Sequence, residues 1–325
     1  MKHYLVIGAG PIGNILSAHL LKEGIDVTLV DILKERLLEI KQKGLTVKDP
    51  GNQIRGDFVV FPKKFLFSSK EISEKPDLIF ISVKTYSLMD VVSDISEISF
   101  SPQKLVVFQN GLDNEYQAAE VAGKENVLRC IINYAGSMVS DTEVEVTFFN
   151  RPNYIGVMDK KNIPLAKETA EILTQAGLET EYSGDIKKHA WEKAILNACL
   201  ASVSTVTGLT MKEVMDSNSL REIVEKLLLE GVKVAEGAGV KFSDNFYELG
   251  LSYLSKGGYH KPSMLVDIEK GGKTEIDFLN GKIVEYGEKL DISVPYNWMV
   301  TAIIKGLEQK KIPYIRETQQ KENKP

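Results

Sequence analysis

The chain has 325 residues, of which 43% are hydrophobic and 26% charged, a composition that is typical of a globular protein and excludes long disorder. Its length indicates two domains, since one domain usually holds about 100–200 residues. The net charge of −5 gives no electrostatic reason to expect a nucleic-acid partner.

The first half of the chain alternates short β-rich runs with helical patterns. The predicted strands are Tyr4–Ile7, Asp26–Val30, Leu78–Val83 and Lys104–Phe108. A helix is predicted over Ile12–Glu23, because its apolar residues recur at helical spacing. This alternation predicts parallel strands with crossover helices, which is a doubly wound α/β sheet of the Rossmann type.

The segments that follow have weaker patterns. Gly44–Phe67 contains Gly, Pro and Asn residues that favour turns, and it predicts a small β-rich excursion, that is, a few short strands joined by turns. Val144–Phe149 and Tyr154–Val157 predict two further strands, whose pairing could be antiparallel. A turn and a short strand end near Ser183–Asp185, and we place the domain boundary there.

In the second half, apolar residues recur at intervals of three and four, which predicts an all-α domain. The predicted helices are Ile186–Leu200, Ser219–Ala238 and Ile276–Leu290. The residues expected to stop helices are Gly208, Gly239, Gly271 and Gly272. We therefore expect a dinucleotide-binding Rossmann domain over 1–184 and a helical substrate domain over 185–325, with a frayed polar tail from Glu317.

A glycine-rich motif links the first predicted strand to the first predicted helix. It comprises Gly8, Ala9, Gly10, Pro11, Ile12 and Gly13. Gly8 allows the tight turn, Gly10 lets backbone amides approach a pyrophosphate, and Gly13 lets the helix pack close to the strand. The helix N-terminus then offers N–H groups and a positive dipole to the phosphates. A purely structural turn is the alternative, but the strand–motif–helix context favours a dinucleotide.

Polar residues end three of the predicted strands. Asp31 stands 18 residues after Gly13, where a carboxylate can bond both adenosine ribose hydroxyls and repel a 2′-phosphate, which favours NAD. Lys84 could reach a phosphate or ribose, and the tripeptide Gln109-Asn110-Gly111 could bond the nicotinamide ribose or the substrate. The alternatives are a solvated acid, a solvated lysine and an Asn-Gly turn.

The predicted helix His189–Ala198 is largely apolar, yet Lys193 and Asn197 stand four residues apart on one face. Buried polar groups need partners, and the lining of a polar crevice would supply them. A lysine ammonium there can stabilise the alkoxide that hydride transfer creates on a carbonyl oxygen, and can then donate its proton. A snorkelling surface lysine is the alternative.

Two further polar residues stand at predicted helix starts in the second domain. Ser263 follows Pro262 and is expected to cap a helix, with a hydroxyl that could meet a ligand carboxylate. Thr274 is the predicted N-cap of the next helix. Glu275 falls in the first turn of that helix, where acids are favoured without any catalytic role.

Together these segments resemble the ketopantoate reductases (2-dehydropantoate 2-reductases) over nearly the whole chain. The matching motifs are GAGPIG at 8–13, VK at 83–84, QNG at 109–111, WEKAILN at 191–197 and PSMLVDIEKGGKTEIDFLNG at 262–281. The resemblance implies an enzyme that uses NAD(P)H to reduce the C2 ketone of ketopantoate to pantoate, within pantothenate and coenzyme A biosynthesis.

The resemblance also implies roles for individual residues. Lys193 would be the proton donor, and Asn197 and Ser263 would contact the substrate. Asn110 and Glu275 would lie where cofactor and substrate meet. Ala135 joins the expected cofactor-binding residues.

Three positions depart from the family pattern. Many members carry a basic residue suited to NADPH where this chain has Asp31, so the resemblance favours NADP and the residue favours NAD. Ala201 and Met211 stand where substrate-contacting asparagines are common. Losing amides from a site built on hydrogen bonds can change selectivity strongly, so another 2-oxo acid is an open alternative.

The expected reaction is hydride transfer from the dihydronicotinamide, bound across the carboxyl edge of the sheet, to a small 2-oxo acid in the cleft between the domains. An opine-type dehydrogenase is an alternative within the same fold. A non-catalytic NAD(H)-sensing protein is an alternative from another class, although a sensor needs no proton donor.

The remaining expectations concern location and partners. Cys130 and Cys199 lie in apolar contexts, belong to no metal-ligand spacing and are expected to be buried free thiols. We expect a cytoplasmic protein without a membrane segment, since there is no signal-peptide pattern and no apolar run approaches about 18 residues. The apolar C-terminal helices could form a homodimer interface or could equally be core.

Overall fold

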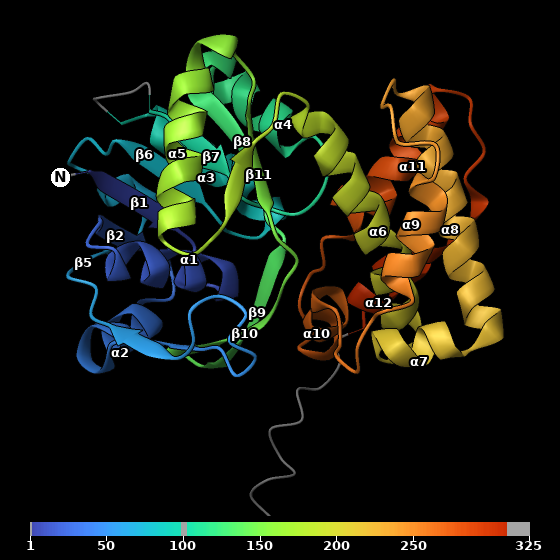
Figure 1. The fold of residues 1–325 in the computed structure, drawn as a ribbon, viewed down its shortest axis with the longest axis horizontal. Helices are drawn as coiled ribbons and strands as arrows, with labels where there is room; N and C mark the ends of the chain where they lie inside the picture. Colours follow the sequence, from blue (N-terminus) through green and yellow to red (C-terminus); the bar gives the residue numbers. More distant parts are fainter. Residues whose placement is uncertain (1, 99–102, 311–325) are drawn as a thin grey trace, which may run out of the picture. The chain divides into compact units, whose positions relative to one another are not determined.

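A computed structural model describes residues 2–98 and 103–310 of the chain. The chain divides into two compact units, an N-terminal unit over Met1–His189 and a C-terminal unit over Ala190–Pro325. Figure 1 shows the sheets of the first unit and the helices of the second. The predicted boundary near Ser183–Asp185 lies just before a helix that begins at Ile186. The division between the two units falls inside this helix, after His189.

The N-terminal unit is built on an eight-stranded sheet with the order β12-β11-β8-β7-β6-β1-β2-β5. In that order the strands are Thr180–Tyr182, Asn153–Val157, Val127–Ile131, Leu105–Val107, Leu78–Ile81, His3–Ile7, Asp26–Val30 and Lys64–Leu66. The strands from β8 to β5 are parallel, and β11 pairs antiparallel with β8. Starting from β1, the chain places β2 and β5 on one side and then β6, β7 and β8 on the other. The strand order therefore reverses between β1 and β6, and doubly wound sheets bind their ligands at such a switch point.

Helices cover both faces of this sheet, as expected for a doubly wound fold. One face packs against α1 (Pro11–Lys22) and α5 (Ile163–Gln175) through a core that includes Val6, Leu16 and Leu173. The other face packs against α3 (Leu88–Ser96) and α4 (Asn114–Ala122) through a second core. The strands between these layers are buried on both sides, which explains their continuous apolar runs.

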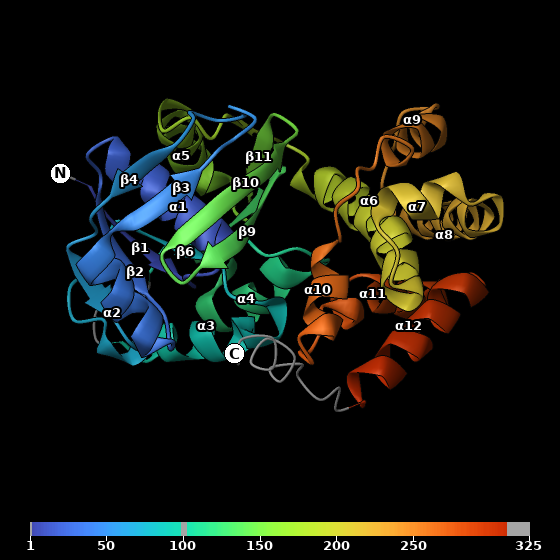
Figure 2. The same ribbon diagram turned by 90° about the horizontal axis from the view of Figure 1, so that it is seen from below.

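A smaller sheet covers the outer side of α1 (Figure 2). Its order is β4-β3-β10-β9, with the bounds Phe58–Val60, Leu45–Lys48, Glu143–Phe149 and Tyr134–Ser140. The strand β10 pairs parallel with β3 and antiparallel with β9. A Cβ on Gly136 of β9 would lie 2.6 Å from Cδ1 of Ile15 in α1, so this sheet contacts the helix directly.

The C-terminal unit is helical, as predicted. After α6 (Ile186–Thr207), which begins in the N-terminal unit, come α7 (Met211–Asp216), α8 (Asn218–Gly237), α9 (Phe246–Leu254), α10 (Ser263–Glu269), α11 (Asn280–Lys289) and α12 (Pro295–Glu308). Gly208, Gly239 and Gly271 follow helices with positive φ, as expected for stop residues, while Gly272 has no such φ. Within the unit, the buried Asn280 amide donates to the carbonyl of Ala198 and to Asn297 Oδ1.

The structure adds two details that the sequence-based expectation left open, and it shows that a third expectation is wrong. The excursion predicted over Gly44–Phe67 supplies two strands to the small sheet, but β5 belongs to the main sheet. The strands predicted at Val144–Phe149 and Tyr154–Val157 exist, and each pairs antiparallel with a neighbouring strand, but they lie in different sheets. The helix predicted over Ile276–Leu290 is a 3₁₀ turn (Ile276–Phe278) followed by α11, because Leu279 leaves helical geometry with φ −114° and ψ −97°.

Both cysteines are free and buried, as predicted. Among the described residues, no helix combines the length and the apolar character that crossing a membrane requires. The predicted tail from Glu317 lies outside the described residues.

Candidate dinucleotide and substrate site

The glycine motif lies at the carboxyl end of β1, directly before α1. Gly8 has φ +108°, and a Cβ there would lie 2.8 Å from the Val83 nitrogen. A Cβ on Gly13 would lie 1.8 Å from the Gly8 oxygen, so no larger residue fits. A Cβ on Gly10 would meet nothing within 4 Å, which leaves this side of the loop open to a ligand.

The start of α1 is suited to phosphates. Gly10 is the N-cap residue and Pro11 follows it, and no side chain of the described residues caps the helix. The N–H groups of the first turn and the positive end of the helix dipole therefore lie beside the open space at Gly10. These features fit the pyrophosphate of a dinucleotide, as the motif predicts.

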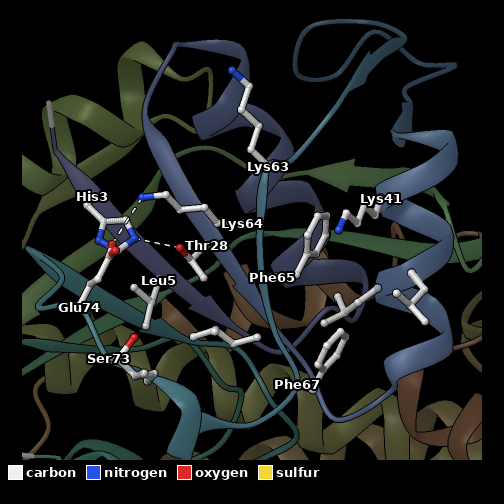
Figure 3. A pocket seen from close by; sticks show the side chains of 14 residues that line it. His3, Leu5, Thr28, Lys41, Lys63, Lys64, Phe65, Phe67, Ser73 and Glu74 are labelled. Carbon is white, nitrogen blue, oxygen red and sulfur yellow. Dashed lines mark hydrogen bonds and ion pairs between the residues drawn. The ribbon is translucent and has the colours of Figure 1, made fainter.

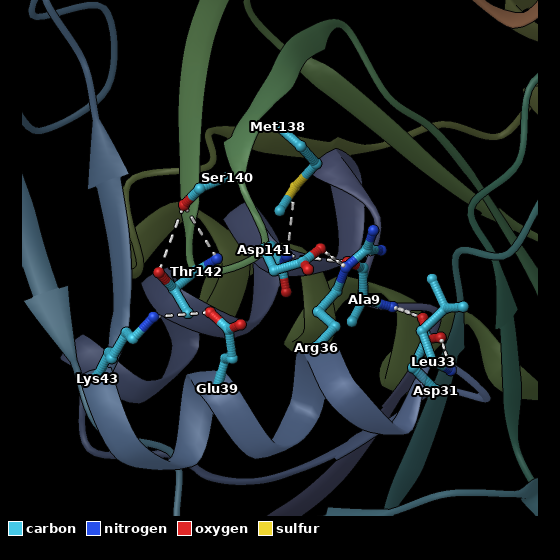
Figure 4. Close-up of polar contacts among 11 residues, drawn as sticks. Ala9, Asp31, Leu33, Arg36, Glu39, Lys43, Met138, Ser140, Asp141 and Thr142 are labelled. Carbon is cyan, nitrogen blue, oxygen red and sulfur yellow. Dashed lines mark hydrogen bonds and ion pairs between the residues drawn. The ribbon is translucent and has the colours of Figure 1, made fainter. Parts of the chain in front are cut away.

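Asp31 lies immediately after β2 and beside the glycine motif (Figure 4). Its Oδ2 accepts a hydrogen bond of 2.5 Å from the Ala9 nitrogen, and its Oδ1 accepts one of 2.8 Å from the Leu33 nitrogen. Each oxygen keeps a lone pair for a further donor, such as a ribose hydroxyl. The structure thus brings Asp31 to the glycine loop, while its contact with a ribose stays a prediction.

Two side chains also hold the Ala9 carbonyl in place by hydrogen bonds. It accepts hydrogen bonds from Asn14 Nδ2 at 2.9 Å and from Arg36 Nη1 at 3.2 Å. Arg36 lies on α2 (Lys34–Lys43), and its Nε forms an ion pair with Asp141 Oδ1 at 3.0 Å. The sequence analysis did not identify Arg36, because it belongs to no motif and its contacts depend on the tertiary fold.

Lys84 and Asn110 lie at the carboxyl ends of neighbouring strands of the main sheet, β6 and β7. The Asn110 carbonyl accepts hydrogen bonds from Thr85 Oγ1 at 3.0 Å and from Asn114 Nδ2 at 2.7 Å. Arg129 Nη2 donates to the next carbonyl, that of Gly111, at 3.0 Å. These three donors hold the backbone that carries Asn110.

The residues that support this loop are deeply buried. Arg129 and Glu115 form an ion pair of 3.6 Å, and their side chains are 1% and 5% exposed. Gln109 is 6% exposed, and neither polar atom of its side chain has a hydrogen-bond partner among the described residues. A buried amide without a partner is costly, so Gln109 is a further candidate for contact with a ligand.

The remaining cofactor residue predicted for the N-terminal unit is Ala135, which lies on β9 opposite Phe148. It is half-buried and precedes Gly136, the residue that contacts α1. The structure therefore puts Ala135 on the small sheet and not on the main sheet.

In the C-terminal unit, Lys193 and Asn197 lie one turn apart on α6, and both are half-buried. The next position on this face, Ala201, is buried at 1% exposure, and Met211 is the first residue of α7. One turn after Asn197 this face is therefore apolar, and the next polar residue on it, Ser204, donates its hydroxyl hydrogen to the Leu209 carbonyl.

The two predicted helix caps differ from expectation. Ser263 is the first residue of α10 and not its cap, because Pro262 occupies the N-cap position and no side-chain cap bond forms. The Ser263 hydroxyl is exposed and not engaged as a cap. Thr274 Oγ1 does accept from the Ile276 nitrogen at 3.2 Å, but Glu275 is the N-cap residue of the 3₁₀ turn. Glu275 is 8% exposed, which is unusual for an acid that only supports a helix start.

The described residues also form a cavity of about 400 Å³ away from the glycine loop (Figure 3). It follows the edge strand β5 and reaches His3 and Thr28, whose side chains are 2.9 Å apart. His3 lies at the amino end of β1, whereas ligands of doubly wound sheets bind at the carboxyl ends. None of the residues predicted to bind the cofactor or substrate lines this cavity.

The fold and the glycine loop define a Rossmann-type dinucleotide-binding protein with a helical C-terminal unit. Residues 4–160 match the family described as "Ketopantoate reductase PanE/ApbA", and residues 185–308 match the C-terminal part of the same family. The chain belongs to the ketopantoate reductase family, and it is an NAD(P)-dependent oxidoreductase.

Relatives agree with this assignment, and solved structures share the fold. A 2-dehydropantoate 2-reductase of Pyrococcus horikoshii is 30% identical over 313 residues, which cover 95% of this chain and 98% of the relative. One from Aquifex aeolicus is 27% identical, covering 94% and 96%. The structure of 2-dehydropantoate 2-reductase from Geobacter metallireducens has a TM-score of 0.85 at 23% identity, covering 94% and 99%. A D-mandelate dehydrogenase in complex with NADH and anilino(oxo)acetate has a TM-score of 0.84 at 22% identity, covering 94% and 98%.

Proposed function

We propose that this protein reduces the C2 ketone of ketopantoate to pantoate, with NADH as the preferred reductant. When bound, the dihydronicotinamide supplies the hydride that adds to C2. The ketone oxygen then takes a proton from the Lys193 ammonium, which leaves a hydroxyl group and a neutral amine. The proposal rests chiefly on Lys193 and Asn197, two half-buried polar residues on one face of a helix that is otherwise largely buried.

The other residues are proposed to bind and orient the reactants. Asn197 and Ser263 bond the substrate, and Asn110 and Glu275 contact substrate and cofactor, so that C2 faces the nicotinamide. Gly8 to Gly13, Lys84 and Ala135 bind the dinucleotide. Asp31 selects NADH, because its carboxylate accepts bonds from ribose hydroxyls and repels a 2′-phosphate.

A second candidate is favoured by a specific observation. Ala201 is fully buried and Met211 is apolar, so two positions that carry asparagine in many family members offer no donors here. A substrate with fewer hydroxyl groups than ketopantoate would suit such a site. The D-mandelate dehydrogenase structure shares this fold, and therefore the fold alone does not select one 2-oxo acid.

We also propose that two copies of the chain pair through α12. The exposed face of this helix is largely apolar and comprises Pro295, Trp298, Met299, Ala302, Ile303 and Gly306, with the exposed Lys305 at its edge. The opposite face, with Val300 and Ile304, is buried in the unit. A contiguous row of exposed apolar side chains of this kind is typical of a protein–protein contact surface. In a two-fold antiparallel pair, bulky Trp298 would lie opposite the small Ala302 and Gly306 of the second copy.

The experiment that tests the proposed reaction is steady-state reduction of ketopantoate with NADH and NADPH in parallel. We expect turnover with ketopantoate and a higher kcat/KM with NADH. Parallel assays with phenylglyoxylate and other 2-oxo acids distinguish the second candidate, and addition of an amine detects an opine-type reaction. A protein that binds NADH but oxidises it with none of these substrates would contradict the enzymatic proposal.

A further inference from the structure

Arg36 projects from α2 back toward the glycine loop (Figure 4). Its Nη1 donates to the Ala9 carbonyl at 3.2 Å, and its Nε pairs with Asp141 Oδ1 at 3.0 Å. Asp141 lies in the turn between β9 and β10 of the small sheet. The Arg36 side chain is 20% exposed and that of Asp141 is 48% exposed, so the cation is largely covered and the carboxylate is accessible.

A single residue, Ala9, links this cation to the proposed ribose-binding acid. The Ala9 carbonyl accepts from Arg36, and the Ala9 nitrogen donates to Asp31 Oδ2 at 2.5 Å. A dinucleotide with a 2′-phosphate would therefore meet two opposite charges at this end of the site. Asp31 would repel the phosphate, whereas a guanidinium is well suited to bind one.

The contacts of Arg36 limit what it can offer to a phosphate. A guanidinium carries five N–H donors in a planar fork, so fixing Nε and Nη1 also fixes the direction of the remaining donors. Asp141 adds a second negative charge to the same region. Both effects disfavour a 2′-phosphate and leave a dinucleotide without that group unaffected.

We propose that Asp141 is a cofactor-selectivity residue, which holds Arg36 against the Ala9 carbonyl and so prevents this arginine from binding a 2′-phosphate. Selection of NADH then has two sources, direct repulsion by Asp31 and the restraint that Asp141 imposes on Arg36. The second source comes from the small sheet, outside the βαβ segment that carries the glycine motif. This inference rests on the proposed dinucleotide site and is independent of the substrate.

The test is the ratio of the NADPH and NADH dissociation constants, measured by calorimetry on the full chain. We expect Asp141→Asn to shift this ratio about fivefold toward NADPH, the size of one exposed ion pair. Arg36→Met in the Asp141→Asn background should cancel the shift, because the gain requires the guanidinium. Asp141→Ser provides the same test with a different side chain if the asparagine variant does not fold.

The matched control is Glu39→Gln, which breaks the exposed ion pair of 2.9 Å between Glu39 and Lys43 on the same helix and should leave the ratio unchanged. An unchanged ratio in both Asp141 variants would overturn the proposal, as would an equal gain in the double variant that lacks Arg36. If the unaltered protein bound neither dinucleotide, the glycine-loop site itself would be refuted, which is a separate result.

Discussion

At the scale of single residues, the proposed chemistry depends on one face of α6. Lys193 and Asn197 are half-buried there, and Ala201 one turn later is buried at 1% exposure. A half-buried ammonium is held by its surroundings more firmly than a surface lysine, which makes it a better-positioned proton donor.

Replacing Lys193 tests this assignment. We expect Lys193→Ala to lower kcat by about 10²–10⁴-fold, the usual contribution of a positioned general acid. The dissociation constant of NADH should change little, because the glycine loop lies in the N-terminal unit. Steady-state kinetics and a binding titration measure the two quantities.

The control for this variant is Lys233→Ala, which removes an exposed lysine from α8 of the same unit. It should behave like the unaltered protein. A Lys193→Ala protein that kept most of its kcat/KM would show that another group donates the proton.

At the scale of elements, α12 combines a fixed start with an uncovered face. Glu230 of α8 accepts hydrogen bonds from the Tyr296 and Asn297 nitrogens at 3.0 and 2.9 Å, which places a carboxylate at the positive end of the α12 dipole. The helix is thereby anchored within its unit. Its exposed side still carries Trp298 at 61% exposure and Ile303 at 41%.

A charge on this exposed face should prevent pairing of two copies. We expect the unaltered protein to be a dimer and Trp298→Glu to be a monomer by light scattering after size exclusion, because a buried unpaired carboxylate is costly. Leu249→Glu, at an exposed position of α9, is the control and should stay dimeric. A monomeric unaltered protein would contradict the proposed pairing.

At the scale of the whole molecule, His19 connects the layers of the N-terminal unit. It lies in α1 at 0% exposure, its Nδ1 is 2.9 Å from the Ala176 carbonyl after α5, and its ring meets Phe58 of β4 edge to face. Burial, and then the charges of Arg55 and Lys22, lower the pKa of His19 from 6.5 to about 4. The folded protein therefore keeps this imidazole neutral where an unfolded chain would protonate it.

Stability should consequently fall in mild acid. Between pH 6.5 and about 4 the unfolded state binds a proton that the folded state does not, so the free energy of unfolding decreases as the pH falls. The loss from this group is at most about 3 kcal/mol. Denaturant midpoints measured from pH 8 to 4.5 should decline for the unaltered protein and decline less for His19→Gln. Equal slopes for the two proteins would exclude His19 as the cause.

The sequence was most informative where local patterns carry the structure. The glycine motif, the alternation of strands and helices and the face shared by Lys193 and Asn197 each depend on spacing within a few residues, and these predictions describe the structure well. Local sequence also misled at one helix start. Ser263 was predicted to cap α10, but the preceding Pro262 occupies the N-cap position, so the predicted serine cap is wrong.

Features that depend on distant contacts were not predictable. The ion pair of Arg36 and Asp141 joins residues 105 positions apart, and neither residue belongs to a motif. The strand β5 has only three residues, too few for a periodic pattern to assign it to the main sheet. The break at Leu279 directly precedes Asn280-Gly281, a dipeptide that favours turns, but the apolar spacing on both sides of it led to the prediction of one continuous helix.

The small sheet has a consequence for synthesis on the ribosome. Thr46 of β3 pairs with Glu143 of β10, about a hundred positions later in the chain. At about 5–20 residues per second, β3 and β4 emerge roughly 5–20 s before the strand that covers them. During that interval the nascent chain exposes an unpaired strand edge, which promotes aggregation or binding by a chaperone.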